Sequence, residues 1–394
     1  MHSTLLFNLL ILLFVSHLLC FYVIVPVSAK VFISIDCGSS SSEPYTDKRS
    51  IVWVGDSQYV QTGEARNVIT ESIPDGLDSH VMSTIREFTT RNKNCYSLDV
   101  ENDKSEDNSK IERVLVRASF YYGNYDNKSN PPIFDLQFNG NKWASVETSM
   151  TRIVYKEVVY SLNQGNTITV CLAQTRLDTL PFISALEIRS LDSDIYGYVD
   201  PNYPLIFMQR EAYGTNTIIR YPEDSCDRIW NPAGPVANIS GGGVTRVKNS
   251  SPSIKVDIAD KVPEALFMTA LMLNNISRTL WISHDIEYYQ VPMNFNAYIS
   301  EVIKLNSTQK RSFNITAYTY NGDSDQEWYI DYGTVIPPYG HALQVHIENL
   351  TVDAYGKYEI DLYATNDSNL PPLINALEAY IIGDKLVQGT NSKD

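Results

Sequence analysis

Two segments decide the fold: Leu180-Pro181-Phe182-Ile183-Ser184-Ala185-Leu186-Glu187-Ile188 and Leu370-Pro371-Pro372-Leu373-Ile374-Asn375-Ala376-Leu377-Glu378-Ala379. Each follows a strand-like segment that ends in a threonine-containing turn, at Thr175 in the first case and at Thr365 in the second. The two segments are 191 positions apart, measured from Ala185 to Ala376, which is about the length of one domain. A unit repeated at this distance predicts two related domains in tandem.

Apolar and polar residues alternate along most of the remaining chain, which predicts β-strands. Strand-like segments cover 31–35, 114–120, 154–162 and 167–173 in the first half and 312–320, 343–347 and 357–364 in the second. Turn residues such as Asn139-Gly140-Asn141 separate them. The segment 264–273 suits a helix as well as a strand. We therefore expect an all-β protein built from two tandem β-sandwich domains packed side by side.

The first 29 residues carry no charged side chain, and 4–27 is strongly apolar. The run ends in Val27-Ser28-Ala29, with small residues where a signal peptidase reads the chain. We predict a signal peptide over 1–29, a first domain over 30–191, a connector over 192–222, a second domain over 223–383 and a short tail over 384–394. A retained signal anchor is the alternative, because an apolar run of this length can span a bilayer.

Charge and motif content exclude several classes of protein. The net charge is −15 and no cluster of Lys or Arg offsets it, so we expect no nucleic-acid partner. Cys-x-x-Cys, His-Glu-x-x-His and Gly-x-Ser-x-Gly are all absent from the sequence, and the glycines 241–243 precede no nearby lysine. We expect neither an enzyme nor a metal or cofactor site. A glycoside hydrolase remains the alternative, because 46 acidic residues make carboxylate pairs common.

Four cysteines remain after the leader: Cys37, Cys95, Cys171 and Cys226. An even number in a secreted chain predicts two disulfides, for which three connectivities are possible. We expect the pairing Cys37–Cys95, which would tie the first strand to a later segment of the same half.

The secretory leader gives meaning to the Asn-x-Ser/Thr sequons in the chain. Attached glycans need solvent, so we expect the modified asparagines on exposed edges and loops. The candidate sites are Asn127, Asn238, Asn249, Asn275, Asn306, Asn314, Asn349 and Asn366.

Several motifs now occur in one order along the chain. They include 32–38 (FISIDCG), 86–88 (REF), 117–126 (RASFYYGNYD), 227–230 (DRIW) and the two closing segments. From about Val31 to Gly383 the sequence resembles the tandem malectin-like ectodomain of plant receptor-like kinases, and its Leu-Pro-Pro segment resembles the leucine-rich-repeat branch. The resemblance implies two malectin-like β-sandwich domains that bind an extracellular ligand.

In such receptors leucine-rich repeats, a transmembrane helix and a kinase would follow, and this sequence contains none of them. We therefore expect either a stand-alone secreted protein of the apoplast or a truncated receptor at the outer face of the plasma membrane. Membrane attachment would need a downstream segment or an uncleaved leader.

Animal malectin is a lectin, so the resemblance suggests carbohydrate as the ligand. Tyr121, Tyr122, Tyr125 and Asp126, around the turn at Gly123, have the aromatic rings and the carboxylate that sugar recognition uses. In the alternative, these rings pack in the core and Asp126 stabilises the turn. The partner expected first is a cell-wall glycan. The other candidate is a secreted peptide or co-receptor held between the two halves, as in Feronia-type relatives.

Overall fold

The computed structural model describes residues 31–68, 80–100, 113–162, 167–233, 239–240, 243–286, 290–320, 327–352 and 356–387. The predicted signal peptide, Asn238 and the glycines 241–242 lie outside these ranges. Within the described residues, the structure has no helix that is both long and apolar enough to cross a membrane.

The described residues form strands and short 3-10 helices, as the alternating sequence predicts. The segment 264–273, which suits either state, divides into a 3-10 helix η3 (Glu264–Met268) and a strand β18 (Thr269–Leu273). The elements of the first half are β1 (Phe32–Asp36), β2 (Tyr45–Thr46), β3 (Val52–Gly55), β4 (Glu64–Asn67), η1 (Val81–Ser83), β5 (Thr84–Glu87), β6 (Lys93–Asp99), β7 (Arg113–Phe120), β8 (Ile133–Phe138), β9 (Asn141–Glu147), β10 (Val154–Ser161), β11 (Thr167–Gln174), β12 (Phe182–Ile183) and β13 (Ala185–Leu191). The further strands are β14 (Leu205–Ala212), β15 (Asn231–Pro232), β16 (Ile239–Ser240), β17 (Val244–Lys248), β19 (Thr279–Asp285), β20 (Pro292–Ile299), β21 (Phe313–Tyr320), β22 (Glu327–Val335), β23 (Leu343–Thr351), β24 (Lys357–Ala364), β25 (Leu373–Ile374) and β26 (Ala376–Ile382).

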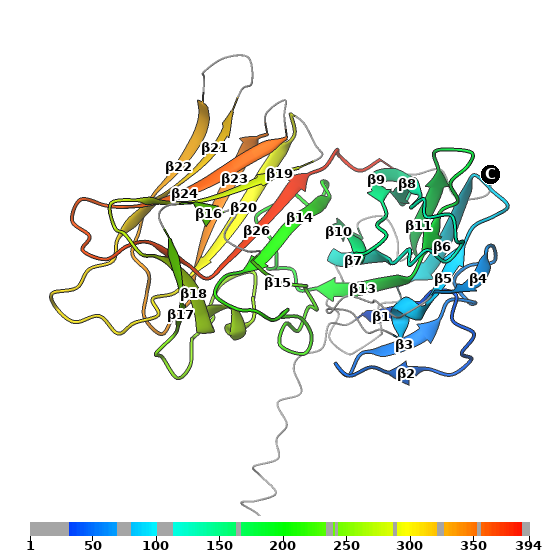
Figure 1. The fold of residues 1–394 in the computed structure, drawn as a ribbon, viewed down its shortest axis with the longest axis horizontal. Coiled ribbons are helices and arrows are strands. Elements are labelled where there is room, and N and C mark those ends of the chain that lie inside the picture. The colour runs from blue at the N-terminus through cyan, green and yellow to red at the C-terminus, as the bar shows by residue number, and fades with distance from the viewer. Residues whose placement is uncertain are drawn as a thin grey trace, which may run out of the picture.

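Each half is a sandwich, and the halves lie side by side (Figure 1). In the first half, the sheet β6-β11-β8-β9 packs over a core that contains Phe120, Leu136 and Leu186. In the second half, the sheet β16-β19-β24-β21-β22 packs over a core that contains Phe295 and Ile360. The prediction of an all-β fold with two sandwiches is therefore confirmed.

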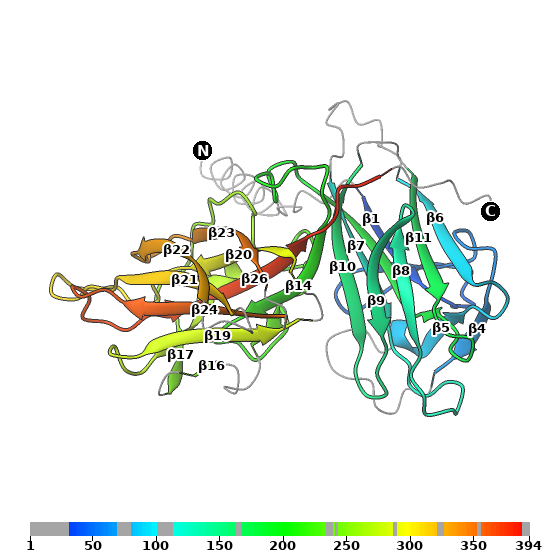
Figure 2. The same ribbon diagram turned by 90° about the horizontal axis from the view of Figure 1, so that it is seen from above.

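One sheet continues through both halves in the order β2-β3-β1-β13-β7-β10-β14-β26-β20-β23, with β15 beside β14 (Figure 2). The halves join where β10 pairs with β14. That ladder contains two residue pairs, Val158 with Ile206 and Val159 with Leu205. The range 192–222, which the sequence marks as a connector, thus contains β14, a strand at the centre of the continuous sheet.

The repeated segments occupy equivalent places in the two halves. In each, the Leu-Pro residues precede a two-residue strand, β12 or β25, and a long central strand, β13 or β26, follows. β13 lies between β1 and β7, and β26 lies between β14 and β20. Each repeated segment therefore supplies a central strand to the continuous sheet.

After β26 the chain returns to the first half (Figure 2). The N–H of Gly383 donates to Pro204 O and that of Leu386 donates to Asn202 O, both at 2.9 Å. The Asn141 side chain then holds Val387 through its amide nitrogen (3.2 Å to the carbonyl) and its oxygen (3.3 Å from the N–H). This segment, residues 383–387, is called the return segment below.

The cysteine pairing expected from the sequence is wrong. Cys95 and Cys171 stand opposite each other on β6 and β11, with Cα atoms 4.0 Å apart, and form a disulfide. Cys37, just after β1, and Cys226 are buried free thiols. Burial raises the pKa of the Cys226 thiol to about 11 and also raises that of Cys37, so both remain protonated.

Candidate functional site

Two of the three tyrosines in the turn that was expected to form a sugar platform are buried, and the third, Tyr125, is half-buried. The side chains of Tyr121 and Tyr122 are 2% and 0% exposed. Tyr122 donates its hydroxyl to Asp126, and Tyr125 donates to Glu87 at 3.0 Å. Burial raises the pKa of Tyr122 to about 12. The turn brings the four residues together, and Tyr121 and Tyr122 pack in the core as in the alternative interpretation, so neither presents a ring face to solvent.

A buried network of ion pairs contains three residues of the motifs that carry the family resemblance. Arg117 from β7 contacts Glu187 at 3.2 Å and Asp227 at 3.4 Å. Arg189 and Arg220 each reach Asp227 at 2.7 Å, and all these side chains are almost fully buried. Burial alone would raise the pKa of Asp227, but the surrounding guanidinium groups outweigh it and lower that pKa.

The same network crosses from the first half to the second. Glu157 on β10 accepts from Arg117 and from Arg210 on β14, both at 2.8 Å. Arg210 also contacts Glu378 of the second closing segment at 2.8 Å. Burial would raise the pKa of Glu157, but Arg210 and Arg117 outweigh it and lower that pKa. Every carboxylate in this chain of contacts is paired, so the network connects β10 to β14 without an uncompensated buried carboxylate.

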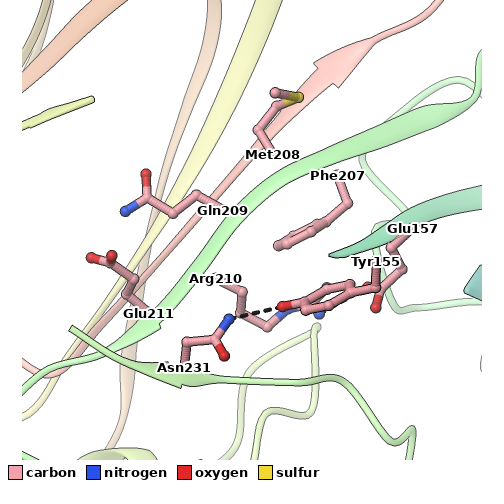
Figure 3. A pocket seen from close by; sticks show the side chains of 8 residues that line it. All are labelled: Tyr155, Glu157, Phe207, Met208, Gln209, Arg210, Glu211 and Asn231. Carbon is pink, nitrogen blue, oxygen red and sulfur yellow. Dashed lines mark hydrogen bonds and ion pairs between the residues drawn. The ribbon is translucent and has the colours of Figure 1, made fainter. Parts of the chain in front are cut away.

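Beyond that short ladder, the two strands diverge and a pocket of about 170 Å³ opens between them (Figure 3). β10 and β14 each pair with another strand on the side away from the pocket, and β15 pairs with β14 only from Glu211 onward. This junction pocket is lined by Tyr155, Glu157, Phe207, Met208, Gln209, Arg210, Glu211 and Asn231.

The β14 wall of the junction pocket is held by hydrogen bonds. Gln209 accepts from the Tyr358 hydroxyl, and its amide nitrogen lies 2.6 Å from Nε2 of His284. Because an amide nitrogen only donates, that Nε2 accepts and the ring carries its proton on Nδ1. Burial lowers the pKa of His284 to about 4, which keeps the ring neutral near pH 7. Burial also raises the pKa of Glu211, whose carboxylate accepts from Tyr213 at 2.9 Å.

The aromatic rings of the pocket come from both strands, Tyr155 from β10 and Phe207 from β14. Asn231 donates to the Tyr155 hydroxyl at 2.8 Å, and the guanidinium of Arg210 lies 3.9 Å from the centre of the Phe207 ring (Figure 3). Gln209 and Glu211 extend from the opposite side of β14 (Figure 3). The pocket therefore joins two rings, two amides and a carboxylate, which suits binding of a polar ligand. Within the described part of the chain, no group of three or more His, Cys, Asp or Glu residues could hold a metal ion.

The residues of the junction pocket were not found from the sequence. Phe207, Gln209 and Glu211 fall in the range read as a connector, and Tyr155 and Glu157 belong to a predicted strand without a recognisable motif. The only signal was the alternation of 154–162, which located the strand but not the pocket beside it.

The predicted glycosylation sites differ in their exposure to solvent. Asn127, Asn275, Asn306, Asn349 and Asn366 are exposed, and Asn314 is half-buried. Asn249 is only 6% exposed; its amide donates to Phe267 O at 3.0 Å and its oxygen accepts from the Ser251 N–H at 2.8 Å. The expectation of an exposed site is wrong for Asn249, because its side chain completes the hydrogen bonding of two backbone segments.

Comparison with known proteins gives one consistent result. A family model described as "Malectin-like domain" matches residues 35–382. The chain is 34% identical to "Uncharacterized protein At1g24485" of Arabidopsis thaliana, over 95% of this chain and 69% of the relative. It is 33% identical to "Probable LRR receptor-like serine/threonine-protein kinase At1g05700" of the same plant, over 92% of this chain but only 40% of that protein.

Solved structures share the fold at low sequence identity. The ANX2 ectodomain of Arabidopsis thaliana matches with a TM-score of 0.72 at 18% identity, over 92% of this chain and 100% of that one. A chain from the structure of "plant peptide RALF23 in complex with FER and LLG2" matches with a TM-score of 0.68 at 16% identity, over 91% of this chain and 99% of that one.

Proposed function

Because this chain belongs to the malectin-like domain family, we propose that it is an extracellular binding module of the receptor-kinase type that holds its ligand at the junction pocket. The observation that carries this proposal is the pocket itself, which opens where the continuous sheet passes from one half to the other. A ligand seated there touches β10 and β14 together, and the buried ion pairs beside it keep both strands in place.

The ligand that we propose first is a neutral sugar unit of a cell-wall glycan. The Tyr155 and Phe207 rings offer apolar contact, and Gln209, Glu211 and Asn231 offer hydrogen bonds to hydroxyl groups. The arginine of the pocket, Arg210, is already engaged with Glu157 and Glu378, so it leaves no free cation to attract an acidic sugar. The overall charge of −15 also disfavours anionic ligands.

A secreted peptide with its co-receptor is the second candidate. In the junction pocket, residues 207–210 of β14 form a strand edge that faces β10. Neither β10 nor β15 forms backbone pairs with these four residues. Such an edge can pair with an extended peptide. The comparison also favours this candidate, since one protein with the same fold was solved with the peptide RALF23 and LLG2.

The test is calorimetric titration of the secreted protein with neutral and acidic cell-wall oligosaccharides. We expect binding of a neutral oligosaccharide that Phe207→Ala and Glu211→Gln each weaken at least about tenfold, the loss of roughly one good contact. Tyr329→Ala, an aromatic change at an exposed position of β22, serves as the control and should bind normally. Binding that all three variants retain would exclude the junction pocket. Silence toward every oligosaccharide, together with peptide capture that depends on Phe207, would favour the second candidate.

A further inference from the structure

The five-stranded sheet of the second half has one face on the core and one face outward. On β19 the side chains of Leu280 and Ile282 enter the core, whereas Trp281 between them is 36% exposed. On β22, at the other side of the sheet, Tyr329 is 63% and Tyr332 is 44% exposed. Three large, exposed aromatic side chains therefore lie on the side of this sheet away from the core, called the outer face below.

The strand register places a sequon in the middle of the outer face. Asn314 on β21 stands opposite Tyr363 on β24 and opposite Thr334 on β22. Its neighbours Phe313 and Ile315 enter the core, so Asn314 points outward. Thr334 donates to the Asn314 side-chain oxygen at 2.7 Å, which directs the amide nitrogen away from β22. Among the described asparagines of sequons, Asn314 is the one that lies within the ladders of an open sheet face.

We propose that Asn314 carries an N-linked glycan whose first sugars lie on the outer face, over Tyr363 and toward Trp281. This inference rests on the proposed extracellular function, because it requires passage through the secretory pathway. In the reaction, Nδ2 of Asn314 loses a proton and bonds to the anomeric carbon of N-acetylglucosamine. The bond from that carbon to the pyrophosphate of a lipid-linked oligosaccharide breaks, and the lipid pyrophosphate leaves.

The burial of Thr316 implies that the glycan is transferred before this part of the protein folds. Thr316 supplies the hydroxyl of the sequon but is only 2% exposed in the folded protein. The transferring enzyme must reach that hydroxyl, so the reaction precedes closure of the five-stranded sheet. Folding then brings Tyr363 beside the modified asparagine, since residues that are directly opposite on antiparallel strands have Cβ atoms about 5 Å apart.

Geometry and chemistry both suit a sugar on this face. Trp281 lies two strands away from Asn314 and two residues further along its strand. The usual strand spacing and the rise per residue place the two residues about 12 Å apart. Aromatic rings such as those of Tyr363 and Trp281 receive the apolar side of a pyranose. The glycan would also cover aromatic surface that could otherwise mediate self-association.

The experiment uses the full chain secreted from plant cells, with glycopeptide mass spectrometry and acrylamide quenching of tryptophan fluorescence. The variants are N314Q and, as a matched control on an exposed turn, N366Q. We expect glycan at both asparagines in the unaltered protein. N314Q should lose the protection of Trp281 from the quencher, whereas N366Q should keep it. The added quenching should disappear when W281F is combined with N314Q.

The outcomes separate this inference from the proposed function. A protein that carries glycan at Asn366 but none at Asn314 overturns the inference alone. A glycan at Asn314 whose removal leaves Trp281 equally protected overturns the placement of the sugars on the outer face. A full chain that stays inside the plant cells and carries no glycan at any sequon counts against passage through the secretory route, and therefore against the proposed function as well.

Discussion

Replacement of Arg210 by methionine tests whether the buried ion pairs hold the two halves together. The Arg210 guanidinium lies between Glu157 on β10 and Glu378 on β26, at 2.8 Å from each, and is fully buried. Methionine keeps much of the apolar stem but leaves two buried carboxylates without this partner. Loss of one partner of a buried pair typically costs about 3–5 kcal/mol. Over a domain of this size that corresponds to about 6–20 °C in Tm.

Differential scanning calorimetry at pH 7 measures the effect. Lys310→Met is the control, because its partner Asp367 is 65% exposed and such a pair is worth about 0–1 kcal/mol. Addition of Glu378→Gln to Arg210→Met should recover part of the loss, since it removes one of the two unpaired charges. An Arg210→Met protein within about 1 kcal/mol of the unaltered protein would refute the reasoning, because the network would then contribute no more than a surface pair.

Three further predictions concern stability and modification. Burial raises the pKa of Asp36 from 3.8 to about 6, so its stabilising contribution is complete below pH 3.8 and is lost as pH rises through 6. Urea unfolding should show a decline of about 3 kcal/mol between pH 3 and pH 7 that Asp36→Asn abolishes. The double change Cys95→Ala and Cys171→Ala should cost about 2–5 kcal/mol, and alkylation of the denatured, unreduced protein should label Cys37 and Cys226 but not the other two. Asn249→Gln should cost about 1–3 kcal/mol, and the peptide that contains Asn249 should be free of glycan in the secreted protein.

Each of these has a clear contrary result. An Asp36→Asn protein whose stability falls with pH as steeply as that of the unaltered protein would remove the argument from burial. Labelling of Cys95 or Cys171 would show that the disulfide is absent in solution. A secreted, stable protein with sugar on Asn249 would contradict the hydrogen bonding described for that side chain.

The fold class was predictable because the sequence patterns that indicate strands lie within single short segments of the chain. Alternation within single strands indicates β7, β10, β11 and β24, and the repeated closing segments indicate two equivalent halves without any knowledge of strand pairing. Strand pairing, in contrast, is a relation between distant residues. Cys95 and Cys171 are partners because β6 and β11 are neighbours, and nothing in the spacing of the cysteines encodes that neighbourhood.

Burial at the predicted turn and the position of the pocket were beyond the sequence for a similar reason. At the predicted sugar platform, Gly123 and Asn124 both have positive φ values, 47° and 54°, and this bend keeps Tyr125 and Asp126 beside Tyr122. Sequence spacing does not show which way such a turn folds. The junction pocket arises where two strands diverge, and that divergence is a property of the assembled sheet rather than of either strand.

The return segment has a mechanical consequence. Val387, the last described residue, lies beside Asn141 on β9, in the first half, although β26 belongs to the second. Tension applied at that point first loads the hydrogen bonds of Asn141, Asn202 and Pro204, and reaches β26 only after they yield. The amino-terminal sandwich thus acts as the anchor through which a pull from the carboxyl-terminal side is felt.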